Sequence, residues 1–359
     1  MARVGTNLRT SYLESNEVLR RPYQKLLVVL VLVTASALPA GGSSEYFLHL
    51  INLSFLACIG ALGLMMLTGF CGQISLGHAA FLAIGGFTTV ILTVHLKMPF
   101  IVVVPVAAIA GAVVGFIVGL PSLRFRGVYL AISTLAMHYA IMFLCTVYQA
   151  KFGASATAGI TIADPTFGSF RLRGVYAWYY FLLVLVTFVT IACVNLVRTR
   201  VGRAWMAIRD RDIAAEALGI NLTRYKLGAF MLSATLASVS GSLMAYYSNV
   251  VTVEGYTLDL AVIYVAMIIV GGMGSIMGAL MGAVFITLLP YGIEHLFEYL
   301  PRAWRFGSTV FGIQVGAVGI CIILFLLFEP KGLAEIWRRI ETYFDRWPFR
   351  YQPLDTARR

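Results

Sequence analysis

Apolar runs of about 20 residues follow one another along most of this 359-residue chain, and they constrain its fold more than any other feature. A run of that length is what an α-helix needs to cross the hydrocarbon core of a bilayer. Hydrophobic residues make up 60% of the chain and charged residues 12%, and its mean hydropathy is +0.85. Charged residues are usually about 25% of a soluble domain. A soluble fold could not hide this much apolar surface from water, so we expect an integral membrane protein.

Ten such runs predict an all-α, polytopic transmembrane helical bundle of about 10 spans, with 8–11 as the range. The first run is short, and the eighth and ninth are separated only by the glycine-rich stretch GGMGS. The count therefore depends on these three. The runs are 25–40, 47–69, 75–95, 99–120, 127–150, 175–197, 226–250, 260–273, 275–298 and 308–328.

The basic residues predict the orientation of the bundle. With the N-terminus inside, 21 of the 27 Lys and Arg residues fall in inner segments and 6 in outer segments. Lys and Arg concentrate in cytoplasmic loops, so both termini are expected in the cytoplasm. The net charge of +11 then follows from topology, and no nucleic-acid partner is needed to explain it. The chain divides into a cytoplasmic N-terminal segment 1–24, a transmembrane domain 25–328 and a cytoplasmic tail 329–359.

The longest internal loop, 198–226, carries seven basic and three acidic residues and is too charged to span a membrane. Its middle is rich in Ala, Leu, Glu and Arg, which predicts one or two short amphipathic helices. Asp210 or Asp212 is expected to cap a helix N-terminus, and Gly219 a C-terminus. Two functions stay open, a solvated loop that only sets orientation and a docking element for a soluble partner. The apolar residues of this stretch form a broken stripe: Trp205, Ile208, Ile213 and Leu218.

Sequence motifs typical of nucleotide-binding, catalytic or metal sites are missing. The chain has no GxxxxGK[ST] phosphate loop, HExxH, GxSxG or Cys/His cluster, so we expect no catalytic or metal site and no enzyme. Its five cysteines form no CxxC pair and fit small core positions. No Asp or Glu lies between Glu45 and Asp164, whereas ion-driven carriers usually place a carboxylate near the midplane. A secondary carrier or channel working alone is therefore less favoured than a subunit energised by another protein.

A few polar residues interrupt the spans, first in GFCGQISLGHAAFLAIGGF, residues 69–87. Gly69 and Gly72 allow a tight turn, and Ser75 is expected to cap the following helix. Two interpretations stay open, a hinge with close helix packing, which we favour, and contact with a solute. The residues expected at the hinge or route are Gln73, Ser75, His78, Tyr129, Ser133 and Thr134. Further polar candidates are Asn52, Ser54, His138, Ser233, Thr235, Ser238, Ser240 and Tyr264.

Two GxxxGxxxG ladders predict close helix–helix contacts, because glycine stripes let backbones approach in lipid. A sliding surface, or contact with a second membrane subunit, is the alternative function. Each ladder is expected to form one smooth stripe on a helix. The first consists of Gly111, Gly115 and Gly119, and the second of Gly274, Gly278 and Gly282.

Four ordered motifs resemble the permease subunits of branched-chain amino acid ABC transporters, in particular the LivM type. They are GFCGQISLGHAAFLAIGGF, RGVYLAISTLAM, RVGRAWMAIRDRDIAAEALGINLTRYKLGAF and IIVGGMGSIMGALMGA. The resemblance covers roughly residues 47–332. It implies a multi-pass permease of the bacterial inner membrane that forms half of a translocation route. It also implies three kinds of partner: a second, LivH-like permease, two cytoplasmic ATPases that bind ATP and Mg, and a periplasmic solute-binding protein.

The resemblance assigns the loop 198–226 to ATPase coupling. Its segment DIAAEALG corresponds to the coupling segment of ABC importers but departs from the commoner EAAxxxG spelling. Branched-chain or other hydrophobic amino acids are the expected cargo, and urea, short amides and aromatic acids are the alternatives. Selectivity is expected to lie mostly in the binding protein. The coupling candidates are Arg203, Arg209, Asp210, Asp212, Ala215, Glu216 and Gly219.

Overall fold

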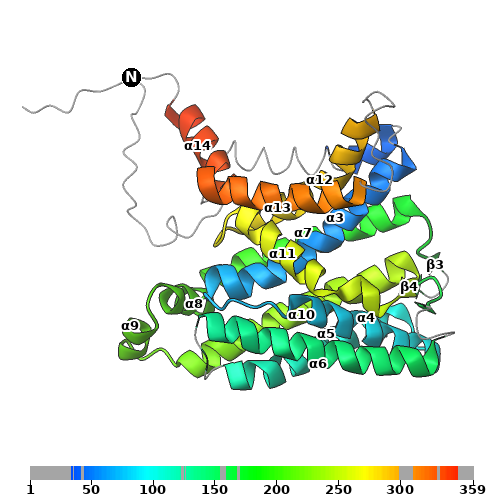
Figure 1. The fold of residues 1–359 in the computed structure, drawn as a ribbon, viewed down its shortest axis with the longest axis horizontal. Helices are drawn as coiled ribbons and strands as arrows, with labels where there is room; N and C mark the ends of the chain where they lie inside the picture. Colours follow the sequence, from blue (N-terminus) through cyan, green and yellow to red (C-terminus); the bar gives the residue numbers. More distant parts are fainter. Residues whose placement is uncertain are drawn as a thin grey trace, which may run out of the picture.

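The computed structural model describes residues 34, 36–41, 44–122, 125, 127–153, 159–167, 170–298, 310–329 and 332–346. In these residues the chain is a helical bundle with two short two-stranded ribbons (Figure 1). The predicted N-terminal segment 1–24 and most of the first run, 25–40, lie outside the described residues.

The all-α fold is confirmed. Helices dominate because every backbone N–H and C=O inside a bilayer must find its partner within the protein. Among the described residues, eight helices are long and apolar enough to cross a membrane. They are α3 (Glu45–Leu64, continued by the π-helical turn Met65–Phe70), α4 (His78–Val90, continued by Ile91–His95), α5 (Phe100–Ser122), α6 (Val128–Phe152), α7 (Val175–Arg198), α10 (Leu222–Ser248), α11 (Leu258–Gly271, with the 3-10 turn η4, Val253–Tyr256, before it) and α12 (Ile276–Glu298).

The tenth predicted run becomes α13 (Val310–Phe328), and α14 (Gly332–Arg346) follows it. The exact number of spans and the cytoplasmic location of the termini stay predictions. The four strands are β1 (Ile160–Thr161), β2 (Thr166–Phe167), β3 (Phe170–Arg171) and β4 (Val250–Val251), and two short helices, α8 (Arg200–Asp210) and α9 (Asp212–Ala217), form most of the loop 198–226.

Segments that the topology predicts on the cytoplasmic side lie together at one end of the bundle. In Figure 1, α8, α9 and α14 occupy this end, and β3 and β4 lie at the other. The Gly274 N–H contacts Sδ of Met65 at 3.2 Å, which joins two inner turns. At the opposite end β1 pairs antiparallel with β4, and Oε1 of Gln149 accepts the Val253 N–H at 2.8 Å. These loops therefore lie at the two ends in the way that the predicted topology requires.

Helix α10 lies at the centre and packs against α3, α4 and α5. Small residues allow this, since a Cβ added at Gly241 would meet the backbone of Leu82 on α4. Serines of α10 also donate hydrogen bonds across these contacts. Ser238 Oγ donates to the Phe81 carbonyl at 2.8 Å and Ser240 Oγ to the Leu56 carbonyl at 2.7 Å. Close backbones and interhelical hydrogen bonds together hold α10 in place.

The first glycine ladder lies along the contact between α5 and α10. A Cβ added at Gly111 would meet Ser238, one at Gly115 would meet Ala234, and one at Gly119 would meet Leu227.

The second ladder differs from its prediction. Gly278 and Gly282 of α12 lie against Gly271 of α11, but Gly274 is in the turn between these helices, with φ +87°. The expectation of a single helical stripe is therefore wrong for Gly274. A chain that must reverse within four residues needs a backbone conformation that L side chains rarely adopt, and glycine supplies it.

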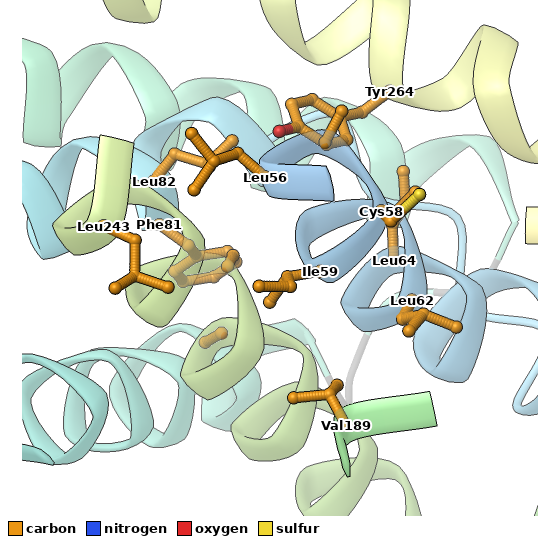
Figure 2. Close-up of a cluster of buried hydrophobic side chains, with 14 of the residues drawn as sticks. Leu56, Cys58, Ile59, Leu62, Leu64, Phe81, Leu82, Val189, Leu243 and Tyr264 are labelled. Atoms are coloured by element: carbon orange, nitrogen blue, oxygen red, sulfur yellow. The ribbon is translucent and has the colours of Figure 1, made fainter. Parts of the chain in front are cut away.

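Apolar side chains fill the space between these helices. Figure 2 shows Leu56, Ile59 and Leu62 of α3 with Phe81 and Leu82 of α4 and with Leu243 of α10. All of these side chains are at most 3% exposed. The core thus lies where α3, α4 and α10 meet, beside the candidate route residues on α4.

We expect Gly115→Ala to destabilise the protein. The new Cβ would lie 2.6 Å from Cβ of Ala234, and overpacking of this kind typically costs about 1–3 kcal/mol. Gly228→Ala on α10 is the matched control, because a Cβ there meets no atom within 4 Å and helical Ala gains about 0.5–1 kcal/mol over Gly. Thermal unfolding of the purified protein in detergent measures both. Equal midpoints for the two variants would contradict close packing along α5 and α10.

Candidate functional site

The helix pair α8 and α9 is the first candidate site. Thr199 caps α8, with its Oγ1 accepting the Val201 N–H at 3.2 Å. Helix α9 begins at Asp212 after an N-cap Arg211 that makes no side-chain capping bond. The expectation that Asp210 or Asp212 caps a helix is therefore wrong for α9, because the residue in the cap position is the arginine between them.

Helix α9 ends in a glycine turn. Gly219 has φ +84°, its N–H bonds to the Glu216 carbonyl at 2.9 Å, and the Ile220 N–H bonds to the Ala215 carbonyl at 3.1 Å. These paired bonds form a Schellman motif, which satisfies carbonyls that the helix end leaves open. The turn gives α9 a fixed end and directs the chain into α10.

One face of the pair is fixed to the bundle. Trp205 is 2% exposed and its Nε1 donates to the Tyr225 carbonyl at 2.8 Å. Nζ of Lys226, on α10, lies 2.7 Å from Oδ2 of Asp212. The Lys226 side chain is 7% exposed and that of Asp212 26%. Loss of one partner would leave a nearly buried charge, which is strongly destabilising, so this pair anchors α9.

Arg209 also turns toward the bundle. Its Nη1 donates to the Gly69 carbonyl at 2.5 Å, at the end of the π-helical turn that follows α3. A side chain at Gly274 would collide with the same guanidinium, and one at Gly72 would press on the Arg209 backbone. Arg209 thus contacts two separate glycine turns, the one after α3 and the one between α11 and α12.

The opposite face of the pair is open. Ile213 is 75% exposed and Leu218 81%, so the apolar stripe divides, with Trp205 and Ile208 buried in the bundle and these two facing outward. The predicted coupling residues divide in the same way. Arg209 and Asp212 contact the bundle and Ala215 is buried, whereas Asp210, Glu216 and Gly219 are exposed. Arg203 is also exposed, and its Nη1 donates to the Arg198 carbonyl at 3.0 Å.

The segment 71–77 holds two of the predicted hinge or route residues, Gln73 and Ser75, and contacts a third, Thr134. Thr134 Oγ1, on α6, accepts the Leu76 N–H at 3.0 Å and donates to the Ala131 carbonyl at 2.9 Å. Ser75 is 1% exposed, and its Oγ accepts the Gly77 N–H at 3.3 Å. The N-cap of α4 is Gly77 rather than Ser75, so that expectation is wrong. Thr134 and Ser75 thus fix the segment at the start of α4.

Several side chains in and next to this segment are buried, so the segment is closely packed in the bundle. Gln73 is 8% exposed and its Nε2 donates to the Cys71 carbonyl at 3.4 Å. Burial raises the pKa of the Cys71 thiol to about 12. His78 is 1% exposed and its ring meets Tyr264 of α11 at 5.0 Å in an edge-on contact. The other two predicted route residues lie apart, because Tyr129 is 73% exposed and Ser133 is only partly buried on α6.

A cavity of about 450 Å³ lies between α3, α10, α11 and α12. It extends from the β4 end of the bundle to about mid-depth, where Tyr264 and Met267 lie. None of the six predicted hinge or route residues lines it, but two of the further polar candidates, Ser240 and Tyr264, do. The sequence did not reveal the cavity, because its lining is mostly aliphatic and comes from segments that are distant in sequence, namely α3, α10, α11 and α12 together with Leu82 of α4, β4 and η4.

Comparison with known proteins identifies the family. Residues 46–312 match the family model described as branched-chain amino acid transport system/permease component. The chain is 29% identical over 344 residues to the high-affinity branched-chain amino acid transport system permease protein LivM of Escherichia coli (strain K12), covering 88% of this chain and 76% of the relative.

Two further relatives are named for the transport of different solutes, one for branched-chain amino acids and one for galactose. The probable branched-chain amino acid transport permease protein LivH of Methanocaldococcus jannaschii is 28% identical, covering 66% of this chain and 75% of the relative. The galactose/methyl galactoside import permease protein MglC of Escherichia coli (strain K12) is 28% identical, covering 55% and 61%. No solved structure matches the chain. The helical bundle and the family match together show that the chain belongs to the branched-chain amino acid transport permease family and is a membrane transport subunit of the LivM type.

Proposed function

We propose that this chain forms half of the translocation route of an ATP-driven importer for branched-chain or other hydrophobic amino acids. A LivH-like permease would supply the other half, and two cytoplasmic ATPases would bind ATP and Mg. A solute-binding protein would deliver the cargo, and the bacterial inner membrane would be the location. Similarity to both a LivM and a LivH protein supports a paired permease.

One observation carries the coupling part of this proposal. Helices α8 and α9 are anchored to the bundle on one face and expose Ile213, Leu218 and Glu216 on the other. A solvated loop that only set orientation would need neither buried anchors nor an exposed apolar pair. Exposed apolar side chains rimmed by charges are typical of protein–protein contacts, so this surface is where an ATPase would bind.

Arg209 supplies a path from that surface into the bundle. It is the last-turn arginine of α8 and contacts the ends of two spans, at Gly69 and beside Gly274. Movement of α8 would therefore pull on the turn after α3 and on the turn between α11 and α12 together. Glycines at both turns allow the backbone to change conformation at low steric cost.

The names of the LivM and LivH relatives support amino acids as the cargo. Importers that carry urea, short amides or aromatic acids would use the same membrane machinery, so the ligand of the binding protein distinguishes these alternatives. A stand-alone carrier differs from both kinds of importer, because its uptake would not require an ATPase.

The assembled transporter is expected to take up leucine only with a hydrolysing ATPase. Proteoliposomes containing both permeases and both ATPases, with binding protein outside and ATP inside, should accumulate radiolabelled leucine. An ATPase variant unable to hydrolyse ATP is the control. A thermal-shift screen of the binding protein should show stabilisation by leucine, isoleucine or valine. Uptake that persists with the inactive ATPase would support a carrier. Stabilisation of the binding protein only by urea or amides would show that the cargo is one of these solutes and not an amino acid.

We expect Ile213→Asp to prevent ATPase binding without unfolding the permease. The side chain is 75% exposed, so its replacement costs the isolated chain little, whereas a charge in an apolar contact opposes association. Leu96→Asp is the control, because Leu96 is 57% exposed but lies at the opposite end of the bundle. Co-purification of the ATPase with tagged permease measures the effect. Normal co-purification with Ile213→Asp would exclude this surface.

Arg209→Ala is expected to uncouple ATP hydrolysis from uptake. The Gly69 carbonyl would lose a charged donor at a partly buried site, which costs about 1 kcal/mol. Arg211→Ala, at the exposed N-cap of α9, is the matched control. The ratio of leucine taken up to ATP hydrolysed should fall several-fold for Arg209→Ala and stay unchanged for the control. An unchanged ratio for Arg209→Ala would contradict the role of this contact in transmission.

A further inference from the structure

The cavity between α3, α10, α11 and α12 has the size and lining of a small-molecule site. Its volume of about 450 Å³ is in the range of ligand pockets, which are about 300–1,000 Å³. The deeper part of its wall is aliphatic or thioether in character. The side chains that form this part are Leu56, Ala57, Leu82, Ile263, Met267 and Ile286.

Three polar groups of the wall follow one face of α12, and the other polar lining residues are Ser240, Ser248, Thr252, Tyr256 and Tyr264. Thr287, Tyr291 and Glu294 recur at helical spacing and line the cavity in order toward its outer end. Among the lining residues in the described part of the chain, Glu294 is the one acidic residue and is exposed, and none of them is Lys, Arg or His. The wall therefore offers acceptors for a cationic group and no positive charge for an anionic one.

The Thr287 hydroxyl is unsatisfied inside this wall. Its Oγ1 is buried and has no hydrogen-bond partner within the described part of the chain. Thr89 and Thr235, on other spanning helices, donate to the carbonyl four residues before them, that of Gly85 and that of Met231, whereas Thr190 on α7 has a buried hydroxyl without a partner as Thr287 does. A buried hydroxyl without a partner costs free energy unless an occupant of the cavity completes it.

Pro290 adds a second acceptor at the same level. It lies within α12 and has no N–H, so the Ile286 carbonyl cannot receive the usual helical hydrogen bond from that position. Both residues line the cavity. The Ile286 carbonyl and the Thr287 hydroxyl thus belong to one turn of α12 and the Glu294 carboxylate to a turn about two turns further along, a set that suits an ammonium group.

We propose that this cavity holds an α-amino acid with a branched aliphatic side chain, the side chain inserted toward Leu56 and Met267 and the ammonium group near Thr287 and Glu294. The inference rests on the proposed function and adds a site within this single subunit. The carboxylate of the solute stays at the outer mouth in contact with water, because the wall carries no cation to replace its hydration. Tyr264 lies across the deep end, with its ring against His78 and over Gly60, and Figure 2 shows it near Leu56.

Filling the cavity tests the proposal. Ile263 lines it, whereas its neighbour Val262 does not and is 46% exposed. In proteoliposomes containing the whole importer, with saturating leucine-loaded binding protein, Ile263→Trp should lower the rate of leucine uptake at least about tenfold. Val262→Trp, the matched control, should stay within about twofold of the native rate. The amount of assembled complex and its thermal midpoint are measured for each.

Thr287→Val provides a second test that does not depend on filling the cavity. The substitution keeps the shape and removes a hydroxyl that has no partner in the chain, so the thermal midpoint should stay equal or rise. Leucine uptake should fall about tenfold if the hydroxyl contacts the solute. Thr146→Val is the control, because Thr146 is exposed on α6 and bonds to the Met142 carbonyl away from the cavity.

Leucine uptake by the native complex distinguishes a failure of the cavity proposal from a failure of the proposed function. If it takes up leucine but Ile263→Trp and Thr287→Val both transport within about twofold of the native rate, the cavity is not a solute site and the proposed function stands. If the native complex takes up no leucine, the proposed function fails, and this inference fails with it.

Discussion

The close approach of α10 to α3, α4 and α5 is the contact on which the rest of the structure depends. Between helices in lipid, burial of apolar side chains gains little, because lipid tails are just as apolar. Backbone proximity and interhelical hydrogen bonds must provide the specificity instead. Small residues such as Gly241 and Gly115 provide the proximity, and the hydroxyls of Ser238 and Ser240 provide the bonds.

The same helix connects the two candidate sites. Lys226, in the second turn of α10, pairs with Asp212 of α9, and Ser240, Met244 and Ser248 near its other end line the outer cavity. A displacement of α9 would therefore reach the cavity wall along one helix. The Arg209 contact acts beside it, on the turns that end α3 and α11. Two mechanical connections thus lead from the proposed ATPase surface into the bundle, one through a rigid helix and one through glycine turns.

In the fold, the stretch 69–87 has a structural role that differs from the one its residues suggest in the sequence. Its polar residues suggest a solute site, but Ser75 is used in a local turn and His78 packs on Tyr264. They position the start of α4 and support the residue that closes the deep end of the cavity. The solute contacts that we propose come from aliphatic residues and from Thr287, which no polar motif in the sequence singled out.

The amino-acid sequence by itself determined the helical fold, the order of the spans, the helices of the loop 198–226 and the family. Each of these follows from local properties, namely the length of apolar runs, helix propensity and contiguous motifs, which act within about 20 residues of chain. Tertiary structure alone decided which side chains face each other. It turned Arg209 inward to Gly69 and left Ile213 and Leu218 exposed. It also placed Gly274 in a turn and assembled a cavity from segments that are distant in the sequence. Such outcomes depend on how helices rotate and pack against partners far along the chain, and a periodic pattern does not encode that.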